Sequence, residues 1–255
     1  MIPRGEAHLY VALEDQIREP ALLAAYDALL TPEERARKQR YLFDKNRHEY
    51  LITRALARSV LSRYAPVRPA AWTFSTNEWG CPAIASPEGR GLRFNLSNTQ
   101  GLVCCVVALD RDVGIDVEDV SREGETVTIA DRFFSPSEVE ELRGQPEERR
   151  RARFFDYWTL KEAYIKARGM GLAIPLDHFS FQLSPGLPVG IAFDPRLDDD
   201  PTSWQFEQIR PTANHLVSVA IRRKNEDDLR LVVRRVTPLL PAADVLIDVP
   251  VPRSA

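Results

Sequence analysis

The sequence predicts an α+β fold built from two similar halves, because a weak internal repeat is accompanied by matching helices. Residues 94–109 can be laid on residues 206–221 without gaps. Both segments begin with an aromatic residue, pass a polar turn and end in an apolar run typical of a strand. A helix is expected before each copy, at residues 45–64 and 155–168. Two packed α+β units leave a cleft between them, where ligand sites are common.

The chain is accordingly divided into three parts. An N-terminal half is predicted at residues 1–112, a C-terminal half at 113–237, and a loosely attached tail at 238–255. The tail is rich in proline and has little hydrophobic periodicity, which is typical of a terminal extension.

Composition and charge exclude several classes of protein. The 255 residues have a formal net charge of −3, with 44% hydrophobic and 28% charged residues, which gives no argument for binding nucleic acid or membranes. We find no run of 18 apolar residues that would indicate a transmembrane helix, and no signal-peptide pattern at the start. The three cysteines have neither disulfide nor metal-ligand spacing, so we expect a cytoplasmic protein whose Cys104 and Cys105 pack inside a strand.

Local patterns place the remaining elements. Thr31 and Pro32 form a helix start, and Ser135, Pro136 and Glu138 form a capping box at another. The other predicted elements are a first strand at residues 7–13, a helix at 20–30, a hairpin at 71–84, and strands at 102–109, 179–181 and 216–221.

A helix predicted at residues 158–169 carries two charged groups on one face. Glu162 and Lys166 are four residues apart and therefore lie one turn from each other, and Gly169 provides a stop. Two interpretations are open. The pair is either an exposed ion pair worth a few tenths of a kcal/mol, or part of a functional site.

A strand at residues 114–118 carries a second acidic motif. Asp116 and Glu118 project from one face, and Ile115 and Val117 from the other. They form either the polar face of a half-buried strand or a site for a hard cation. Mg²⁺ prefers oxygen ligands and is usually held by one or two carboxylates plus substrate phosphates. On the second interpretation, Asp116, Glu118 and Glu162 hold one Mg²⁺ with room for a pyrophosphate.

Four motifs in this order resemble those of the 4′-phosphopantetheinyl transferase superfamily. They are Phe94-Asn95-Leu96-Ser97, Gly114-Ile115-Asp116-Val117-Glu118, the segment 132–138 and the segment 158–166. The resemblance runs from about residue 30 to residue 222, and length and motif order favour the monomeric, surfactin-synthetase-activating (Sfp) type. It implies the two-halved fold predicted above, with the active site in the cleft between the halves.

The resemblance also implies an activity. Family members move the 4′-phosphopantetheine arm of coenzyme A onto a serine of an apo acyl or peptidyl carrier protein, and release adenosine 3′,5′-bisphosphate. By this resemblance Mg²⁺ is bound by Asp116, Glu118 and Glu162, and coenzyme A is the co-substrate. Glu162, through a water molecule, is the candidate base for the serine proton, and Lys166 stabilises the transferred phosphoryl oxygens. Because a carboxylate that ligates Mg²⁺ is a poor base, the two roles of Glu162 compete.

Coenzyme A contacts are expected from a basic region and from the motif around Ser97. A charge cluster at residues 35–47 is either a solvated face or, as in the family, a source of cations for the phosphates, with Arg37, Arg40 and Arg47 favoured. Ser97, Asn98 and Lys166 are the other expected contacts. Asn98 departs from the family histidine, and Cys81 stands where a cationic residue is common.

These two departures leave an alternative function open. A non-catalytic module that binds coenzyme A or a carrier protein would retain the fold, and Asn98 and Cys81 favour it slightly. The presence of all three carboxylates and Lys166 favours the enzyme. The basic run at residues 149–153 is either a solvated helix face or a surface that attracts an acidic carrier. No nucleic acid, no membrane and no second subunit is expected as a partner.

Overall fold

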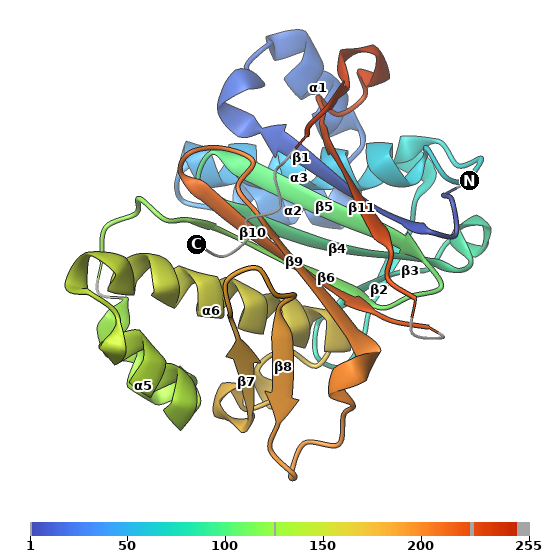
Figure 1. Cartoon of the computed structure of the whole chain (residues 1–255). Helices are drawn as coiled ribbons and strands as arrows, with labels where there is room; N and C mark the ends of the chain where they lie inside the picture. The colour runs from blue at the N-terminus through green and yellow to red at the C-terminus, as the bar shows by residue number, and fades with distance from the viewer. Residues whose placement is uncertain (1, 125, 225–226, 249–255) are drawn as a thin grey trace.

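The computed structural model describes residues 2–124, 126–224 and 227–248, which form two main sheets that pack against each other (Figure 1). The first sheet has the strand order β12-β11-β1-β5-β4 and the second β6-β10-β9. The strands of the first sheet are β1 (Glu6–Leu13), β4 (Leu92–Thr99), β5 (Leu102–Leu109), β11 (Arg230–Arg235) and β12 (Val245–Leu246). Those of the second are β6 (Val113–Asp119), β9 (Trp204–Ile209) and β10 (His215–Arg222).

Helices and two small hairpins complete the fold. The helices are α1 (Pro20–Ala28), α2 (Pro32–Gln39), α3 (Asp44–Leu61), α4 (Ala130–Phe133), α5 (Pro136–Gly144) and α6 (Glu147–Arg168). One hairpin pairs β2 (Phe74–Thr76) with β3 (Pro82–Ile84), and the other pairs β7 (Phe179–Gln182) with β8 (Gly190–Phe193). The capping box predicted at Ser135 with Glu138 is present, and the helix start predicted at Thr31 also forms a capping box, with Glu34. No helix among the described residues is long and apolar enough to cross a membrane.

The two halves repeat one topology, as the sequence repeat predicts. In the first half β1 pairs with β5 and β5 with β4, while in the second β6 pairs with β10 and β10 with β9, all antiparallel. Each half also has one long helix, α3 or α6, and one hairpin, β2–β3 or β7–β8. The α+β prediction with two similar halves is therefore confirmed.

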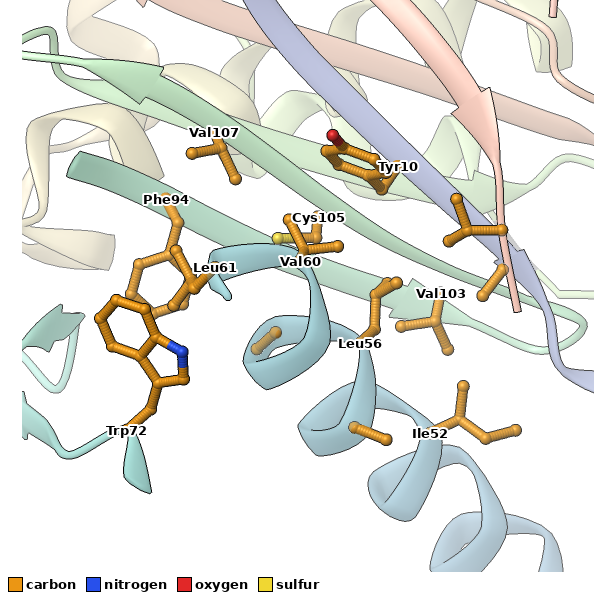
Figure 2. Close-up of a cluster of buried hydrophobic side chains, with 14 of the residues drawn as sticks. Tyr10, Ile52, Leu56, Val60, Leu61, Trp72, Phe94, Val103, Cys105 and Val107 are labelled. Carbon is orange, nitrogen blue, oxygen red and sulfur yellow. The ribbon is translucent and has the colours of Figure 1, made fainter. Parts of the chain in front are cut away.

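Three hydrophobic clusters hold these layers together. In the first, α3 packs Ile52, Leu56 and Val60 against Val103 and other side chains of the first sheet (Figure 2). In the second, α6 packs against the second sheet and the β7–β8 hairpin. The third joins the two sheets and contains Cys104, whereas Cys105 belongs to the first, so both cysteines are buried packing residues as predicted.

The halves meet at a seam between the edge strands β4 and β6. Here two side chains of β4 accept hydrogen bonds from backbone amides of β6. Oδ1 of Asn95 accepts from the amide of Ile115 at 3.1 Å, and Oγ of Ser97 accepts from the amide of Val117 at 3.2 Å. Because buried amides need partners, these two side chains replace the missing backbone ladder and fix β6 against the first half.

The described C-terminal residues depart from the predicted division. Strand β11 falls within the range assigned to the second half, yet it pairs in parallel with β1 of the first. The segment 238–248 is also well attached: β12 pairs with β11, Asp244 forms an ion pair with Arg63, and the carbonyl of Pro238 accepts from the Tyr26 hydroxyl at 2.8 Å. The prediction of a loose tail is therefore wrong for these residues, and its remainder, 249–255, lies outside the described residues.

Candidate active site at the seam between the halves

A glycine lets the acidic strand β6 approach helix α6 very closely. A Cβ atom built on Gly114 would lie 2.1 Å from the carbonyl oxygen of Ala163 and 2.3 Å from the amide nitrogen of Ala167. Gly114 therefore faces α6, and strand alternation turns Asp116 and Glu118 to the same side. The helix ends at Gly169 in the left-handed conformation, with φ +67°. The contact brings the two acidic motifs of the sequence together.

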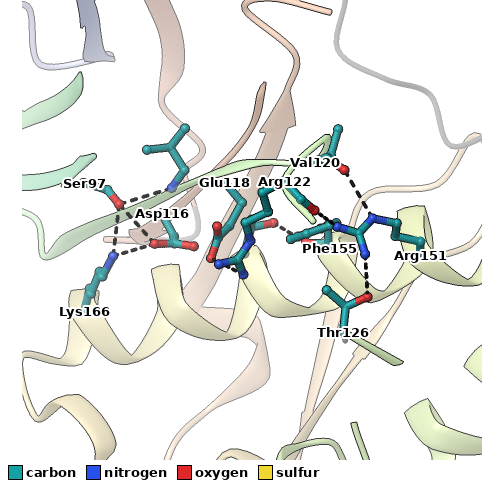
Figure 3. A network of polar contacts seen from close by, with 11 residues as sticks. Ser97, Asp116, Glu118, Val120, Arg122, Thr126, Arg151, Phe155 and Lys166 are labelled. Atoms are coloured by element: carbon teal, nitrogen blue, oxygen red, sulfur yellow. Dashed lines mark hydrogen bonds and ion pairs between the residues drawn. The ribbon is translucent and has the colours of Figure 1, made fainter. Parts of the chain in front are cut away.

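Lys166 of α6 reaches across to Asp116 and Ser97 at the seam (Figure 3). Its Nζ atom donates to Oδ1 of Asp116 at 2.6 Å and to Oγ of Ser97 at 3.2 Å. The Ser97 hydroxyl in turn donates to Oδ1 of Asp116 at 3.0 Å. Among the described residues Lys166 forms no ion pair with Glu162 within 4.0 Å, so the exposed i, i+4 pair considered from the sequence is wrong.

Glu118 lies next to Asp116 in a buried and electrostatically unfavourable position. Burial, together with the neighbouring Asp116, raises the pKa of Glu118 from 4.5 to about 7, against the opposing effects of Arg122, Trp158 and Lys166. The Arg122 guanidinium lies 3.4 Å from Oε1 of Glu118. This carboxyl is therefore partly protonated near neutral pH.

Glu162 of α6 belongs to the same electrostatic cluster. Burial is the main cause that raises its pKa, the charge of Asp116 adds to the effect, and Lys166 opposes it. The charge of Asp116 thus helps to raise the pKa of both Glu118 and Glu162. A cluster of carboxylates whose pKa values rise through burial and mutual repulsion is typical of functional sites.

We next asked whether these residues suit a divalent cation. Within the described residues no three His, Cys, Asp or Glu side chains form a ready-made metal-binding group. However, Oδ2 of Asp116 is buried and has no hydrogen-bond partner, which is unusual for a carboxylate oxygen. This free oxygen and two neighbouring carboxyl groups are oxygen donors of the kind that Mg²⁺ requires. The residues fit the cation, provided that the cations Lys166 and Arg122 move from the oxygens they contact.

The residues predicted to bind coenzyme A phosphates differ in availability. The Arg37 guanidinium lies over the ring of Tyr50 at 5.9 Å, and Arg40 is exposed without an ion pair among the described residues. Arg47, in contrast, forms an ion pair with Asp44. Elsewhere in this basic region, Asp27 pairs with both Arg35 and Lys38. Arg37 and Arg40 are therefore the members of the predicted set with the least competition for their charge.

Asn98 follows Ser97 on β4, but it forms its hydrogen bond with Glu49 rather than with Asp116. Its Nδ2 atom donates to Oε1 of Glu49 at 2.5 Å, and burial raises the pKa of Glu49. Cys81 is half-buried, and burial raises the pKa of its thiol, so this position supplies no charge to a phosphate. Nearby, Asn77 of the β2–β3 turn donates to the carbonyl of Gly169 at 2.7 Å, which ties the hairpin to the end of α6.

Several residues that matter to the site were not singled out from the sequence. Lys161 is fully buried next to Glu162, lies 2.7 Å from Glu138, and donates to the carbonyls of Leu176 and Phe179, each at 2.7 Å. It anchors α6 to the capping box of α5. Asn95 supports β6, and Arg122 contacts Glu118. Lys161 and Asn95 lie within recognised motifs, and Arg122 lies four residues after Glu118, but nothing in the sequence pattern gives their contacts.

The basic run at the start of α6 is largely occupied by structural contacts. Arg150 donates to the carbonyls of Gln145 at 2.9 Å and Arg143 at 3.0 Å, and Arg153 lies 3.4 Å from Glu141. Arg149 is exposed. Arg149, Arg150 and Arg153 are the arginines of this run considered for attracting a carrier, and among them Arg149 is the one left to solvent.

Comparison with known proteins defines the class of this molecule. A family model described as the 4′-phosphopantetheinyl transferase superfamily matches residues 112–220, which include β6, α6 and all three carboxylates. The chain is 34% identical over 217 residues to the 4′-phosphopantetheinyl transferase HetI of Nostoc sp., covering 85% of this chain and 87% of that protein. The chain therefore belongs to the 4′-phosphopantetheinyl transferase superfamily.

Two further relatives agree. The phosphopantetheinyl transferase of Thraustochytrium sp. is 32% identical over 224 residues, which is 81% of this chain and 75% of that protein. The 4′-phosphopantetheinyl transferase Sfp of Bacillus subtilis is 34% identical over 157 residues, which is 61% of this chain and 67% of that protein. The similarity to HetI and to the Thraustochytrium protein extends well beyond the acidic motifs.

Proposed function

We propose that this protein transfers the 4′-phosphopantetheine arm of coenzyme A to a serine of an apo acyl or peptidyl carrier protein. The observation that carries the proposal is the meeting of Asp116, with its unpartnered buried oxygen, and Lys166 at the seam between the halves. Phosphoryl transfer requires a bound cation and a positively charged side chain that stabilise the phosphate oxygens. Asp116 can bind the cation, and Lys166 beside it can contact the phosphoryl oxygens.

In the proposed reaction the serine hydroxyl oxygen of the carrier attacks the β-phosphorus of coenzyme A. A new phosphorus–oxygen bond forms to the serine, and the bond to the adenosine bisphosphate oxygen breaks, so that adenosine 3′,5′-bisphosphate leaves with the electron pair. The serine proton passes to Glu162, through a water molecule. The burial that raises the pKa of Glu162 brings its basicity closer to that needed at neutral pH.

Asp116, Glu118 and Glu162 are the residues that would hold Mg²⁺. When bound, the cation supplies charge stabilisation to the pyrophosphate and its leaving oxygen. Binding a cation makes Glu162 a weaker base, so holding Mg²⁺ and accepting the serine proton through water are competing roles for Glu162. Lys166 exchanges Asp116 for the phosphoryl oxygens of the substrate and stabilises the charge that develops on them.

Coenzyme A is held by residues on the first half of the molecule. Arg37 and Arg40 offer guanidinium groups for phosphates, with Arg47 joining them if its ion pair with Asp44 opens. Ser97, whose hydroxyl donates to Asp116, lies beside the proposed pyrophosphate site, whereas the Asn98 side chain donates to Glu49 and would have to leave that carboxylate to join it. We further propose that the protein acts as a monomer in the cytoplasm and recognises acidic carrier proteins.

The experiment that tests this function is an incubation of the purified protein with coenzyme A, Mg²⁺ and an apo carrier protein. We expect the intact mass of the carrier to increase by one phosphopantetheine arm, with stoichiometric release of adenosine 3′,5′-bisphosphate. A carrier of unchanged mass, together with tight binding of coenzyme A or of the carrier, would instead support the non-catalytic module that Asn98 and Cys81 leave open.

A further inference from the structure

The loop that follows β6 contains Arg122 and is held in place by hydrogen bonds from Arg151. Arg151, in the first turns of α6, is bonded to the polypeptide between Val120 and Thr126 (Figure 3). It donates to the carbonyls of Val120 at 3.4 Å, Gly124 at 3.0 Å and Arg122, and to the hydroxyl of Thr126 at 3.2 Å. One guanidinium thus satisfies three carbonyls, which its planar fork of donors allows.

The loop fixed in this way carries Arg122 back toward the acidic strand. The Arg122 guanidinium lies 3.4 Å from Oε1 of Glu118 and 5.4 Å from the centre of the Phe155 ring. Arg151 lies 5.3 Å from the same ring centre. Because Phe155 is fully buried, its ring gives both guanidinium groups a rigid surface to pack on.

These contacts give the site two internal cations. Lys166 holds Asp116, and the family motif accounts for its presence. Arg122 holds Glu118 and lies outside the motif, in a segment that sequence analysis leaves without a function. A guanidinium and a divalent cation need the same carboxylate charge, so their binding to Glu118 is mutually exclusive or mutually weakening.

We propose that Arg122 is a built-in competitor of the metal ion at Glu118, and that Arg151 is a positioning residue that maintains this competition by folding residues 120–124. The inference rests on the proposed function, since it takes Glu118 as a ligand of Mg²⁺. Its consequence is that loading the metal frees the Arg122 guanidinium from the site, and that the affinity for Mg²⁺ is set lower than the carboxylates alone would give.

The test measures metal affinity rather than transfer. Mg²⁺ is titrated by calorimetry into the protein saturated with coenzyme A, at pH 8.5 and low salt, without a carrier. Arg122→Gln should tighten Mg²⁺ binding by roughly 1.5- to 5-fold, the range that a partly exposed ion pair provides. Arg151→Ala should tighten it in the same direction, because Arg122 is then no longer held in place.

A double-mutant cycle separates positioning from other effects. If Arg151 acts through Arg122, then Arg151→Ala has no further effect in a chain that already carries Arg122→Gln. Arg149→Ala is the matched control, since it removes the same charge from the same helix at an exposed position. Circular dichroism checks that the variants are folded. If Arg151→Ala unfolds, Arg151→Lys replaces it, because lysine keeps the charge but lacks the planar fork of donors. Tighter Mg²⁺ binding is again expected.

Each result has a distinct meaning. Unchanged or weaker binding in Arg122→Gln overturns the proposed competition, and an additive effect of Arg151→Ala overturns the positioning role. A wild-type protein that binds coenzyme A but no Mg²⁺ contradicts the metal assignment in the proposed function, and the competition with it. Tighter binding in Arg149→Ala equal to that in Arg122→Gln would show a general charge effect and would also overturn the proposal.

Discussion

Nζ of Lys166 lies 2.6 Å from Oδ1 of Asp116, and the carboxylate's other oxygen is buried without a partner. The ion pair joins the long helix of the second half to its acidic strand, and Ser97 adds a contact from the first half. One carboxylate is thus at once neutralised by a lysine and left with a free oxygen for a further cation.

Replacing Lys166 by methionine should lower kcat by about 10²- to 10³-fold, because the ammonium that stabilises the phosphoryl oxygens is removed. The variant should also melt at a lower temperature without Mg²⁺, since Asp116 loses its counter-ion, and Mg²⁺ should restore more of its stability than it adds to the wild type. Melting curves with and without Mg²⁺ check this. Lys224→Met, at an exposed site, is the control, and an identical response of both variants would rule out the pairing argument.

The raised pKa of Glu118 gives a pH dependence with a defined sign. From pH 4.5 to about 7 the folded protein retains the proton that an unfolded chain releases. The contribution of Glu118 to the free energy of unfolding is therefore fully present below pH 4.5 and is lost as pH rises through 7. Chemical denaturation without metal should show this decline in the wild type but not in Glu118→Gln.

The raised pKa of Glu118 should also determine how many protons are released when Mg²⁺ binds. Since Mg²⁺ needs the ionised carboxylate, its binding at pH 7 should release about half a proton from Glu118, and almost none from it at pH 8.5. Calorimetry in buffers of different ionisation enthalpy measures the released protons. A wild type and a Glu118→Gln variant that release equal numbers at pH 7 would show that Glu118 is not a ligand.

Asn98→His should restore a cation beside the pyrophosphate. The neighbouring Glu49, which accepts from Asn98 at 2.5 Å, would also favour the charged form of the histidine. We expect coenzyme A to bind this variant more tightly than it binds the wild type, by up to about 5-fold, with the advantage growing as pH falls from 8 to 6. Calorimetric titration at both pH values decides, and an advantage that does not depend on pH would place residue 98 away from the phosphates.

Gly114→Ala should separate β6 from α6. The added methyl group would meet the backbone of Ala163 and Ala167 at 2.1 and 2.3 Å, which no side-chain rotation relieves. We expect a loss of about 1–3 kcal/mol in the free energy of unfolding and a fall in kcat, because Lys166 moves relative to Asp116. Gly144→Ala, where a Cβ atom meets nothing within 4 Å, is the matched control. Equal stability of the two variants in urea would argue against the close approach.

Much of the fold follows from local sequence patterns, whereas the seam does not. The helix start at Thr31, the capping box at Ser135 and the strand at residues 102–109 depend on neighbouring residues, and each is found where it was expected. The internal repeat between the halves is matched by the β4–β5 and β9–β10 pairs. The bonds from Asn95 and Ser97 to β6 depend on two sheets meeting edge to edge, which no periodicity reveals. Likewise the parallel pairing of β11 with β1 joins two segments that are far apart in the sequence. The predicted division at residue 112 therefore assigns β11 to the wrong half.

The candidate site was predictable in its residues but not in their contacts. The spacing of Glu162 and Lys166 suggested a pair within one helix, yet the ammonium finds the more buried Asp116 on another element. Arg122 and Arg151 belong to no recognised motif, and a run of arginines in a sequence gives no sign of which one folds a loop. Such roles arise from tertiary packing and become visible only in the structure.

The most direct test of the account is the single-turnover rate of carrier modification by the wild type and by Asp116→Asn, followed by intact mass with coenzyme A and Mg²⁺ in excess. Asparagine keeps the size of the side chain but removes the charge that a cation and Lys166 both need. We predict that the wild type converts the carrier fully, while the folded variant leaves it in the apo form over the same time. Transfer by Asp116→Asn at the wild-type rate would contradict the assignment of the active site to this seam.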